Sequence, residues 1–300
     1  MKTRNLLSLR KRIRFLSNFQ KITKSISLIS AIKFQRVYQK ISNILRNVFY
    51  FLDIFEEIIK RHPKTLEKIA DLKPKLKGKK LIICIASDKG LAGSFDYLIL
   101  KKTEEFLDGD FYLGTIGLKA EKYFKKKYKL LFSFSKFENV LPEDFAKELI
   151  NYLQLLIEQE KIKEVYLIRP NLTSSGFVVE NVKVFPFDLE TISDLLEKIK
   201  IKTKEFLELR KEPISKEFKY ILEPSPEIIL KTILNQIFYL IFYALILEAQ
   251  ASLEFTRTIT MKKASENAQE LKEKEILNYN KMRQQKITEE LIDIRRWKEK

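Results

Sequence analysis

The heptapeptide SDKGLAG at residues 87–93 has the residue types of a phosphate-binding loop. It follows an apolar run at residues 81–86 and precedes a helical pattern at residues 95–107, and backbone amides at a helix N-terminus bind anions. Its two glycines, however, are spaced G-x-x-G, so it lacks both the G-x-G-x-x-G spacing of dinucleotide sites and the GK[ST] ending of a P-loop. The pattern therefore favours a structural turn and predicts no bound cofactor. The residues that would shape this turn are Asp88, Gly90 and Gly93.

Single copies of the two most versatile reactive residues restrict the chemistry further. Cys84 is the only cysteine, which excludes an internal disulfide, a C-x-x-C redox pair and a cysteine-built zinc site. His62 is the only histidine, which removes most metal-hydrolase and Ser-His-Asp schemes. Cys84 lies in an apolar run typical of a core strand, and His62 stands where a long helix ends, beside its dipole. No spacing of carboxylates singles out a catalytic pair, so we expect no catalytic group and no metal site.

The turn-forming residues are confined to the middle of the chain. The 300 residues include 7 Gly and 8 Pro, and all of them lie between Pro63 and Pro226. Since helix interiors exclude proline and disfavour glycine, the two ends are expected to be uninterrupted helices. This predicts three parts: an N-terminal helix at 1–62, a central domain at 63–226 and a C-terminal helix at 227–300.

Both ends carry apolar residues at helical spacing. About 60 residues of helix span roughly 90 Å and about 70 residues span roughly 100 Å, which exceeds an ordinary domain. Two such helices at opposite ends of one chain can bury their apolar stripes against each other as an antiparallel coiled coil. The stripe predicted for the first half of the N-terminal helix consists of Leu9, Ile13, Leu16, Phe19, Ile22, Ile26, Ile29, Ile32 and Phe34.

The central part alternates between short apolar runs and helical patterns, which is typical of an α/β fold with a mostly parallel sheet. Strands are predicted at 81–86, 111–116, 130–134, 164–168 and 178–187. Helices are predicted at 95–107, 119–128 and 142–160, the last with Pro142 in its first turn.

The net charge of +17 calls for an acidic partner, for nucleic acid or for an anionic membrane surface. Residues 1–62 hold 14 Lys and Arg against 3 Asp and Glu, so +11 of this charge lies on the N-terminal helix. Composition alone leaves open a nucleic-acid-binding basic coiled-coil protein. A nucleotide-using α/β enzyme, acting at the 87–93 turn, stays open as well. The most apolar window, 233–247, is shorter than a bilayer span and ends at Glu248, which favours a buried helix.

Five motifs, in the same order along the chain, resemble the gamma subunit of F-type ATP synthases. The N-terminal helix contains QKITKSISLISAIK at 20–33, close to the family's QKITKAMEMVAASK. The 87–93 turn is similar to the family's S/T-D-R/K-G-L-C/A-G. Three further strings resemble family motifs: YILEPSP at 220–226, RTITMKKASENA at 257–268 and YNKMRQQKITEEL at 279–291. The combination covers both ends and the middle of the chain.

The resemblance implies a fold and a role. The fold would be a long antiparallel coiled coil of the two terminal helices plus a central Rossmann-like α/β domain. The chain would be the central-stalk rotor subunit, non-catalytic, turning inside a ring of alpha and beta subunits and changing the nucleotide affinity of each beta site. Its α/β domain would stand on the membrane c-ring beside the epsilon subunit. The protein would be peripheral, without a transmembrane span, on the cytoplasmic side of the cell inner membrane, and the acidic loops of the beta subunits would match the N-terminal charge.

Carried over by position, the resemblance also implies coupling residues. Arg257 and Gln284 would meet the catch loops of the ring. The other residues expected at the rotor–stator interface are Lys24, Ser25, Ile26, Thr288, Glu290 and Asp293. The sequence departs from the family pattern at Ile26 and Ile32, and its C-terminal tail RRWKEK at 295–300 replaces a small-residue tail. These departures leave room for a paralogous shaft of a related rotary ATPase.

Overall fold

The computed structural model describes residues 6–63, 65, 78–135, 138, 142–173, 176–186 and 222–298. Contacts divide the chain into two units. Unit 1 comprises residues 1–32 and 255–300, and unit 2 comprises residues 33–254. Two long helices contribute to both: α1 (Leu6–Arg61, 56 residues) and α8 (Pro226–Lys298, 73 residues). The three-part division at residues 62/63 and 226/227 follows the helix ends and stays a prediction; its 187–221 segment lies outside the described residues.

Unit 1 is an antiparallel pair of helices. Contacts between them run in opposite directions along the chain: Ser27 Oγ donates to the Thr258 carbonyl (3.0 Å), Ser265 Oγ to the Gln20 carbonyl (3.4 Å). Near the far end, Arg12 Nε lies 3.1 Å from Glu275 Oε1. The predicted antiparallel packing of the two ends is therefore confirmed.

The buried positions of unit 1 follow a seven-residue repeat. On α1 they are Leu9, Leu16, Thr23 and Ser30, and on α8 Met261, Ala268 and Glu275 follow the repeat, while the buried Arg257 precedes Met261 by four residues. A strict seven-residue repeat imposes a left-handed supercoil on a helix pair. We call the face of each helix that carries these positions the seam.

The predicted apolar stripe of α1 was wrong in part, because the seam also contains small polar residues. Phe19, Ile22, Ile29 and Ile32 are exposed, whereas Thr23 and Ser30 are buried. Small side chains let two helix backbones approach closely enough for a serine hydroxyl to reach the opposite carbonyl. Four bulky residues of the predicted stripe therefore lie outside the seam, whereas Leu9 and Leu16 belong to it.

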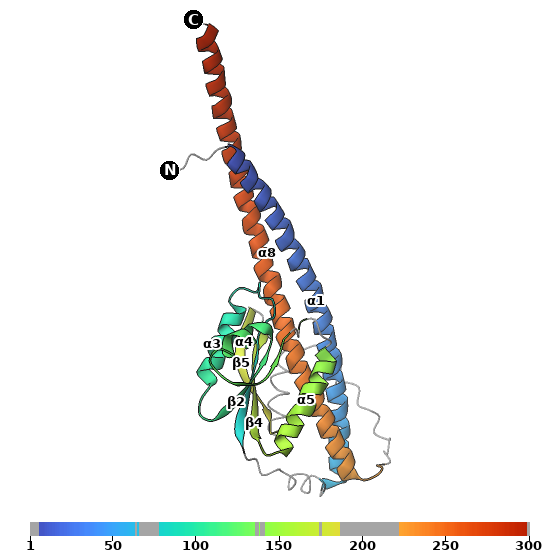
Figure 1. Ribbon diagram of the computed structural model, residues 1–300. Coiled ribbons are helices and arrows are strands. Elements are labelled where there is room, and N and C mark those ends of the chain that lie inside the picture. Colours follow the sequence, from blue (N-terminus) through green and yellow to red (C-terminus); the bar gives the residue numbers. More distant parts are fainter. Residues whose placement is uncertain are drawn as a thin grey trace. The chain divides into compact units, whose positions relative to one another are not determined.

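Unit 2 is a five-stranded sheet with helices on both faces (Figure 1). The strand order is β3-β2-β1-β4-β5; the first four strands are parallel and β5 is an antiparallel edge. This confirms the predicted α/β class and mostly parallel sheet. The elements, besides α1 and α8, are β1 (Lys79–Ile85), α3 (Phe95–Phe106), β2 (Phe111–Ile116), α4 (Leu118–Phe124), β3 (Leu130–Phe134), α5 (Pro142–Glu158), β4 (Ile162–Thr173) and β5 (Gly176–Phe185).

Ring contacts and strand alternation show which helix covers which face. Phe106 of α3 packs edge-on against Tyr166 of β4, with ring centroids 5.2 Å apart. Phe145 of α5 stacks on Phe134 of β3. Phe134 and its register partner Ile116 lie together on the face of the sheet opposite to Tyr166. Since successive side chains of a strand alternate between faces, α3 covers one face and α5 the other. The core of unit 2 also takes in buried residues of α1 from Val37 to Ile58 and of α8 from Leu230 to Leu253.

Two elements end four or five residues away from their predicted ends, and the other predicted strand and helix ends between residues 78 and 186 lie within two residues of the observed ones. β4 extends to Thr173 instead of ending at Ile168, because the hairpin with β5 pairs residues beyond the last partner in β1. Helix α4 ends at Phe124 rather than Tyr128, as the lysine-rich stretch after it forms turns.

Helix α8 contains one stretch that is long and apolar enough to cross a membrane by length and composition, and half of that stretch is buried inside the structure. Every residue from Leu240 to Ala249 is buried, together with strand and α5 residues of the same core. A core helix passes the same composition test, and the burial favours the core assignment for this stretch.

Candidate functional site

The predicted coupling residues fall into two groups along α1 and α8 of unit 1. The Ser27–Thr258 hydrogen bond brings the stretch 24–26 of α1 next to Arg257 of α8. Gln284 is 27 residues further along α8, which corresponds to about 40 Å of helix. The structure thus brings Lys24, Ser25 and Ile26 together with Arg257, and places Gln284 apart from them.

Within the first group the side chains differ sharply in exposure. Lys24 and Ser25 are exposed, Ile26 is half-buried, and Ser25 Oγ bonds back to the Lys21 carbonyl at 2.9 Å. Arg257 is only 5% exposed, so it presents little surface to a partner chain. Its placement suits a residue that holds the two helices in register more than one that meets an outside loop.

The second group lies on the part of α8 beyond the last contact with α1. Gln284, Thr288, Glu290 and Asp293 are all exposed, and α1 begins at Leu6, opposite the turn of α8 that precedes Gln284. Thr288 Oγ1 bonds back to the Gln284 carbonyl (2.9 Å), and Lys286 lies 3.9 Å from Glu290. These side chains stand on a helix that has no neighbouring helix among the described residues, and they are accessible to a partner.

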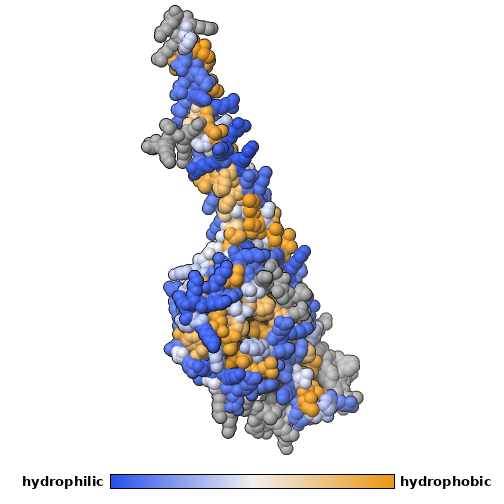
Figure 2. All heavy atoms as spheres, in the orientation of Figure 1, coloured by the Kyte–Doolittle hydropathy of each residue, from blue (hydrophilic) through white to orange (hydrophobic). Residues whose placement is uncertain are grey.

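Six large apolar residues of α1 that lie outside the seam form a third feature of unit 1, and the stripe prediction assigned four of them, Phe19, Ile22, Ile29 and Ile32, to the interior. We call them the outer face of α1. They are Phe15, Phe19, Ile22, Leu28, Ile29 and Ile32. Orange patches among blue on the paired helices are visible in the narrow upper part of Figure 2. Contiguous exposed apolar residues on a soluble surface mark an interaction site.

At the 87–93 turn, carboxylates of the protein accept the backbone hydrogen bonds that phosphate oxygens would accept in a phosphate-binding loop. Asp88 Oδ1 accepts from Leu118 N and Oδ2 from Glu138 N, both at 3.0 Å. Glu138 Oε1 in turn accepts from Asp88 N at 2.7 Å, and Asp96 accepts from Ser87 N at 2.8 Å. Because several amides are bonded to carboxylates and Asp96 stands in the first turn of α3, the site repels an anion.

Glycines complete the same turn by adopting left-handed backbone. Gly90 has φ +72° and Gly93 has φ +61°, values that residues with a Cβ rarely take. Gly90 N donates to Ser87 Oγ at 2.9 Å, which closes the loop on itself. The arrangement supports a structural turn, with Asp88, Gly90 and Gly93 as its framework.

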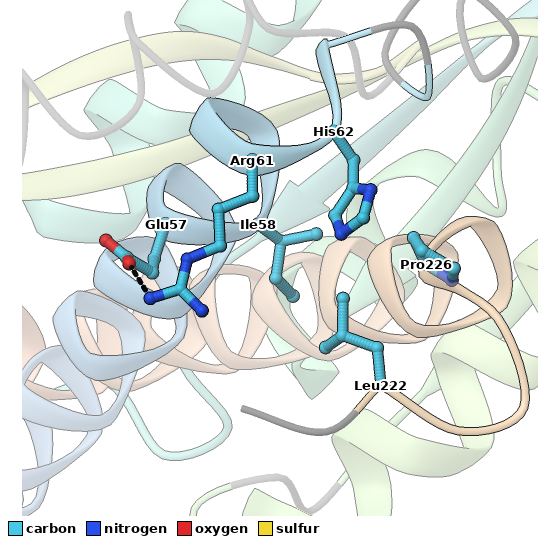
Figure 3. Close-up of a pocket in the computed structure, with 6 residues that line it drawn as sticks. All are labelled: Glu57, Ile58, Arg61, His62, Leu222 and Pro226. Atoms are coloured by element: carbon cyan, nitrogen blue, oxygen red, sulfur yellow. Dashed lines mark ion pairs between the residues drawn. The ribbon is translucent and has the colours of Figure 1, made fainter. Parts of the chain in front are cut away.

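The two single-copy residues are placed without a reactive neighbourhood. Burial raises the pKa of the Cys84 thiol to about 12, an effect that the hydrogen bond from Thr103 only partly offsets. His62 lines a cavity of about 370 Å³ with Glu57, Ile58, Arg61, Leu222 and Pro226 (Figure 3). Arg61 NH2 lies 2.6 Å from Glu57, so its charge is already compensated. Among the described residues, no three His, Cys, Asp or Glu side chains group as metal ligands would.

Buried charges in unit 2 are the residues that the sequence analysis missed. Arg169 of β4 and Glu248 of α8 form an ion pair of 2.7 Å, and both side chains are buried. A glutamate directly after an apolar run, and an arginine directly after a buried strand, were the available signals. Glu248 was interpreted only as the end of that run.

Comparisons with known proteins agree with this arrangement along the whole chain. The family model described as ATP synthase matches residues 5–295. The ATP synthase gamma chain of Clostridium novyi is 30% identical, with 96% of this chain and 95% of the relative covered.

Solved structures show the same fold. In the rotor of the Euglena gracilis mitochondrial ATP synthase, one chain matches with a TM-score of 0.59 and 13% identity, over 94% of this chain and 98% of that one. A chain in the central stalk and c-ring of the Tetrahymena thermophila mitochondrial ATP synthase matches with a TM-score of 0.55 and 19% identity, over 81% and 99%. With a family model that spans nearly the full length, the chain belongs to the ATP synthase gamma chain family.

Proposed function

We propose that this chain is a rotating shaft that couples ion flow across a membrane to nucleotide chemistry on partner subunits, and that it carries no catalytic group of its own. As a gamma chain it is a central-stalk rotor subunit of an ATP synthase. The proposal concerns how the subunit works there. It acts by differential binding, since each orientation of the shaft favours a different conformation of the surrounding sites.

The observation that carries the proposal is the outer face of α1. Its apolar side chains are exposed although the helix has a partner, because the seam is made of smaller and more polar residues. A two-helix pair that needed only to hold itself together would bury its largest side chains. Residues that are apolar and outward-facing along several turns suit a shaft enclosed by a sleeve of other subunits.

The surrounding partners follow from the family and from charge. We infer that the sleeve is a ring of alpha and beta subunits, and that acidic loops of the beta subunits meet the net charge of +11 on residues 1–62. The α/β domain is proposed to stand on the c-ring beside the epsilon subunit. The protein is then peripheral, on the cytoplasmic side of the cell inner membrane.

The coupling residues take different roles in this proposal. Lys24 and Ser25 are exposed and can meet the ring directly, as can Gln284, Thr288, Glu290 and Asp293. Arg257 is buried, and we assign to it the positioning of the helix pair at the height of Ile26. A loss of Arg257 would then shift the contacts of its neighbours.

Co-expression with the alpha and beta subunits of the same genome tests the proposal. We expect a complex whose ATP hydrolysis requires this chain. The free chain should neither hydrolyse ATP nor bind it at the 87–93 turn. Normal assembly and turnover of the complex in the absence of the chain would contradict the proposal.

A further inference from the structure

Unit 2 contains a cluster of charged and polar side chains between the sheet and α8, in which Arg169, Asn171 and Glu248 are buried and Glu180 is half-buried. Arg169 is 1% exposed, and its NH1 donates to Glu248 Oε2 at 2.7 Å. Its NH2 lies 3.8 Å from Glu180 Oε2 on β5, the cross-strand partner of Arg169. Asn171 Nδ2 donates to Glu180 Oε1 at 2.5 Å. The cluster therefore joins β4, β5 and α8 in the interior.

Arg169 lies on β4 just beyond the last residue that pairs with β1. The pairing of β4 with β1 ends at Ile168, and from Arg169 onward β4 pairs only with β5. Strand alternation sends Arg169 to the face opposite Tyr166 and α3. Its guanidinium therefore points to the face that α8 covers.

Glu248 is the one charged side chain among residues 240–249 of helix α8. Residues 240–249 are buried on every side, and apart from Glu248 all of them are apolar or tyrosine. A helix that is apolar all round packs well in many rotational settings, because dispersion contacts have no direction. A charge-assisted hydrogen bond, in contrast, requires its carboxylate at one azimuth and one height.

Moving α8 by one residue would carry Glu248 about 100° around the axis and 1.5 Å along it. The 2.7 Å bond between the two buried charges would then be broken, and breaking a buried ion pair is strongly destabilising. A buried ion pair contributes little net stability compared with apolar residues of the same size, and its best-attested use is to fix register. The pair is thus suited to specify a setting more than to stabilise the fold.

We propose that the Arg169–Glu248 pair locks the rotational phase of α8 to the sheet, so that torque passes between the α/β domain and the shaft without slip. The inference rests on the proposed function, since only a rotor subunit must transmit torque between these elements. Arg169 and Glu248 are positioning residues, because they touch no substrate. Glu180 supports Arg169 from within the sheet and carries no torque to α8.

The test uses the assembled complex and the ratio of ion pumping to ATP hydrolysis. The double variant Arg169→Met with Glu248→Leu replaces both charges by apolar side chains of similar size. We expect it to assemble, to keep its melting temperature, to hydrolyse ATP, and to lose ion pumping per ATP. The matched control is Glu180→Gln, which removes a charge next to Arg169 without touching α8, and it should pump as the unmodified complex does.

Glu248→Gln is the second variant and keeps an oxygen acceptor for Arg169 at the same place. It should preserve the pumping ratio, which separates the directional bond from the charge, and it serves as the test if the double variant fails to assemble. An unchanged ratio in the assembled double variant overturns the inference, as does a ratio lost in Glu248→Gln while Glu180→Gln is normal. Failure of the proposed function itself would show differently, as a complex that hydrolyses ATP and pumps ions without this chain.

Discussion

Two residues of α1, six positions apart, should respond very differently to truncation. Leu16 lies in the seam and is 7% exposed, whereas Ile22 lies on the outer face and is 58% exposed. Leu16→Ala removes buried carbons and leaves a cavity between the helices, which costs about 2–3 kcal/mol. Ile22→Ala exposes little new surface, and the better helix propensity of alanine offsets the loss, so its cost is about 0.5 kcal/mol or less.

Hydrogen–deuterium exchange of the segment 6–32 in the full chain measures this contrast, because the opening free energy of a helix sets its exchange rate. A cost of about 2–3 kcal/mol corresponds to roughly 30- to 150-fold faster exchange in the Leu16→Ala variant. The Ile22→Ala variant should exchange within about two-fold of the unmodified chain. Equal acceleration in both variants would refute the division of α1 into seam and outer face.

In the assembled complex Ile22 should contribute to binding if partner subunits cover the outer face there. Burying the exposed part of Ile22 would contribute about 1 kcal/mol to binding. Ile22→Ala should then weaken the association of the chain with the alpha and beta subunits by about five-fold. Binding by titration of the preformed ring measures this, and an unchanged affinity would leave the outer face without a partner at Ile22.

Three further predictions concern unit 2. Cys84, whose pKa is raised to about 12 by burial, holds almost no thiolate at pH 8 and should react with iodoacetamide only after unfolding; equally fast reaction of the native chain would contradict this. Gly117→Ala places a Cβ 2.0 Å from the Ala86 carbonyl oxygen and should lower the melting temperature well below that of Gly109→Ala, where the Cβ meets nothing within 4 Å. Asp88→Asn replaces one of the two accepting oxygens by an NH2 group, which cannot accept a hydrogen bond from a backbone amide. It should lower the free energy of unfolding, measured by urea denaturation, by about 1–3 kcal/mol. An unchanged midpoint would exclude a structural role for the turn.

Elements with a strong local pattern were predictable from sequence. The apolar run at 81–86 becomes the central strand β1, buried along most of its length, and the glycine-free ends become α1 and α8. The extension of β4 past Ile168 was not predictable, because it depends on pairing with β5 and not on the residues of β4 alone. Long-range pairing leaves no signal in a single strand.

The seam of unit 1 was mispredicted for a physical reason. Hydrophobic periodicity assigns the most apolar face to the interior, but here Thr23 and Ser30 are buried and Ile22 and Ile29 are exposed. An apolar face that serves a partner chain has the same pattern as one that serves the fold. The placement of the coupling residues on one helix pair was predictable, whereas the burial of Arg257 depends on the packing of both helices.

The seven-residue repeat of the seam gives the helix pair a mechanical handedness. In a left-handed supercoil, twisting the ends further in the left-handed sense draws the helices together and compresses the seam. Twisting in the opposite sense unwinds the pair and pulls on contacts such as Ser27–Thr258 and Arg12–Glu275. The resistance of unit 1 to twisting therefore depends on the direction of the twist.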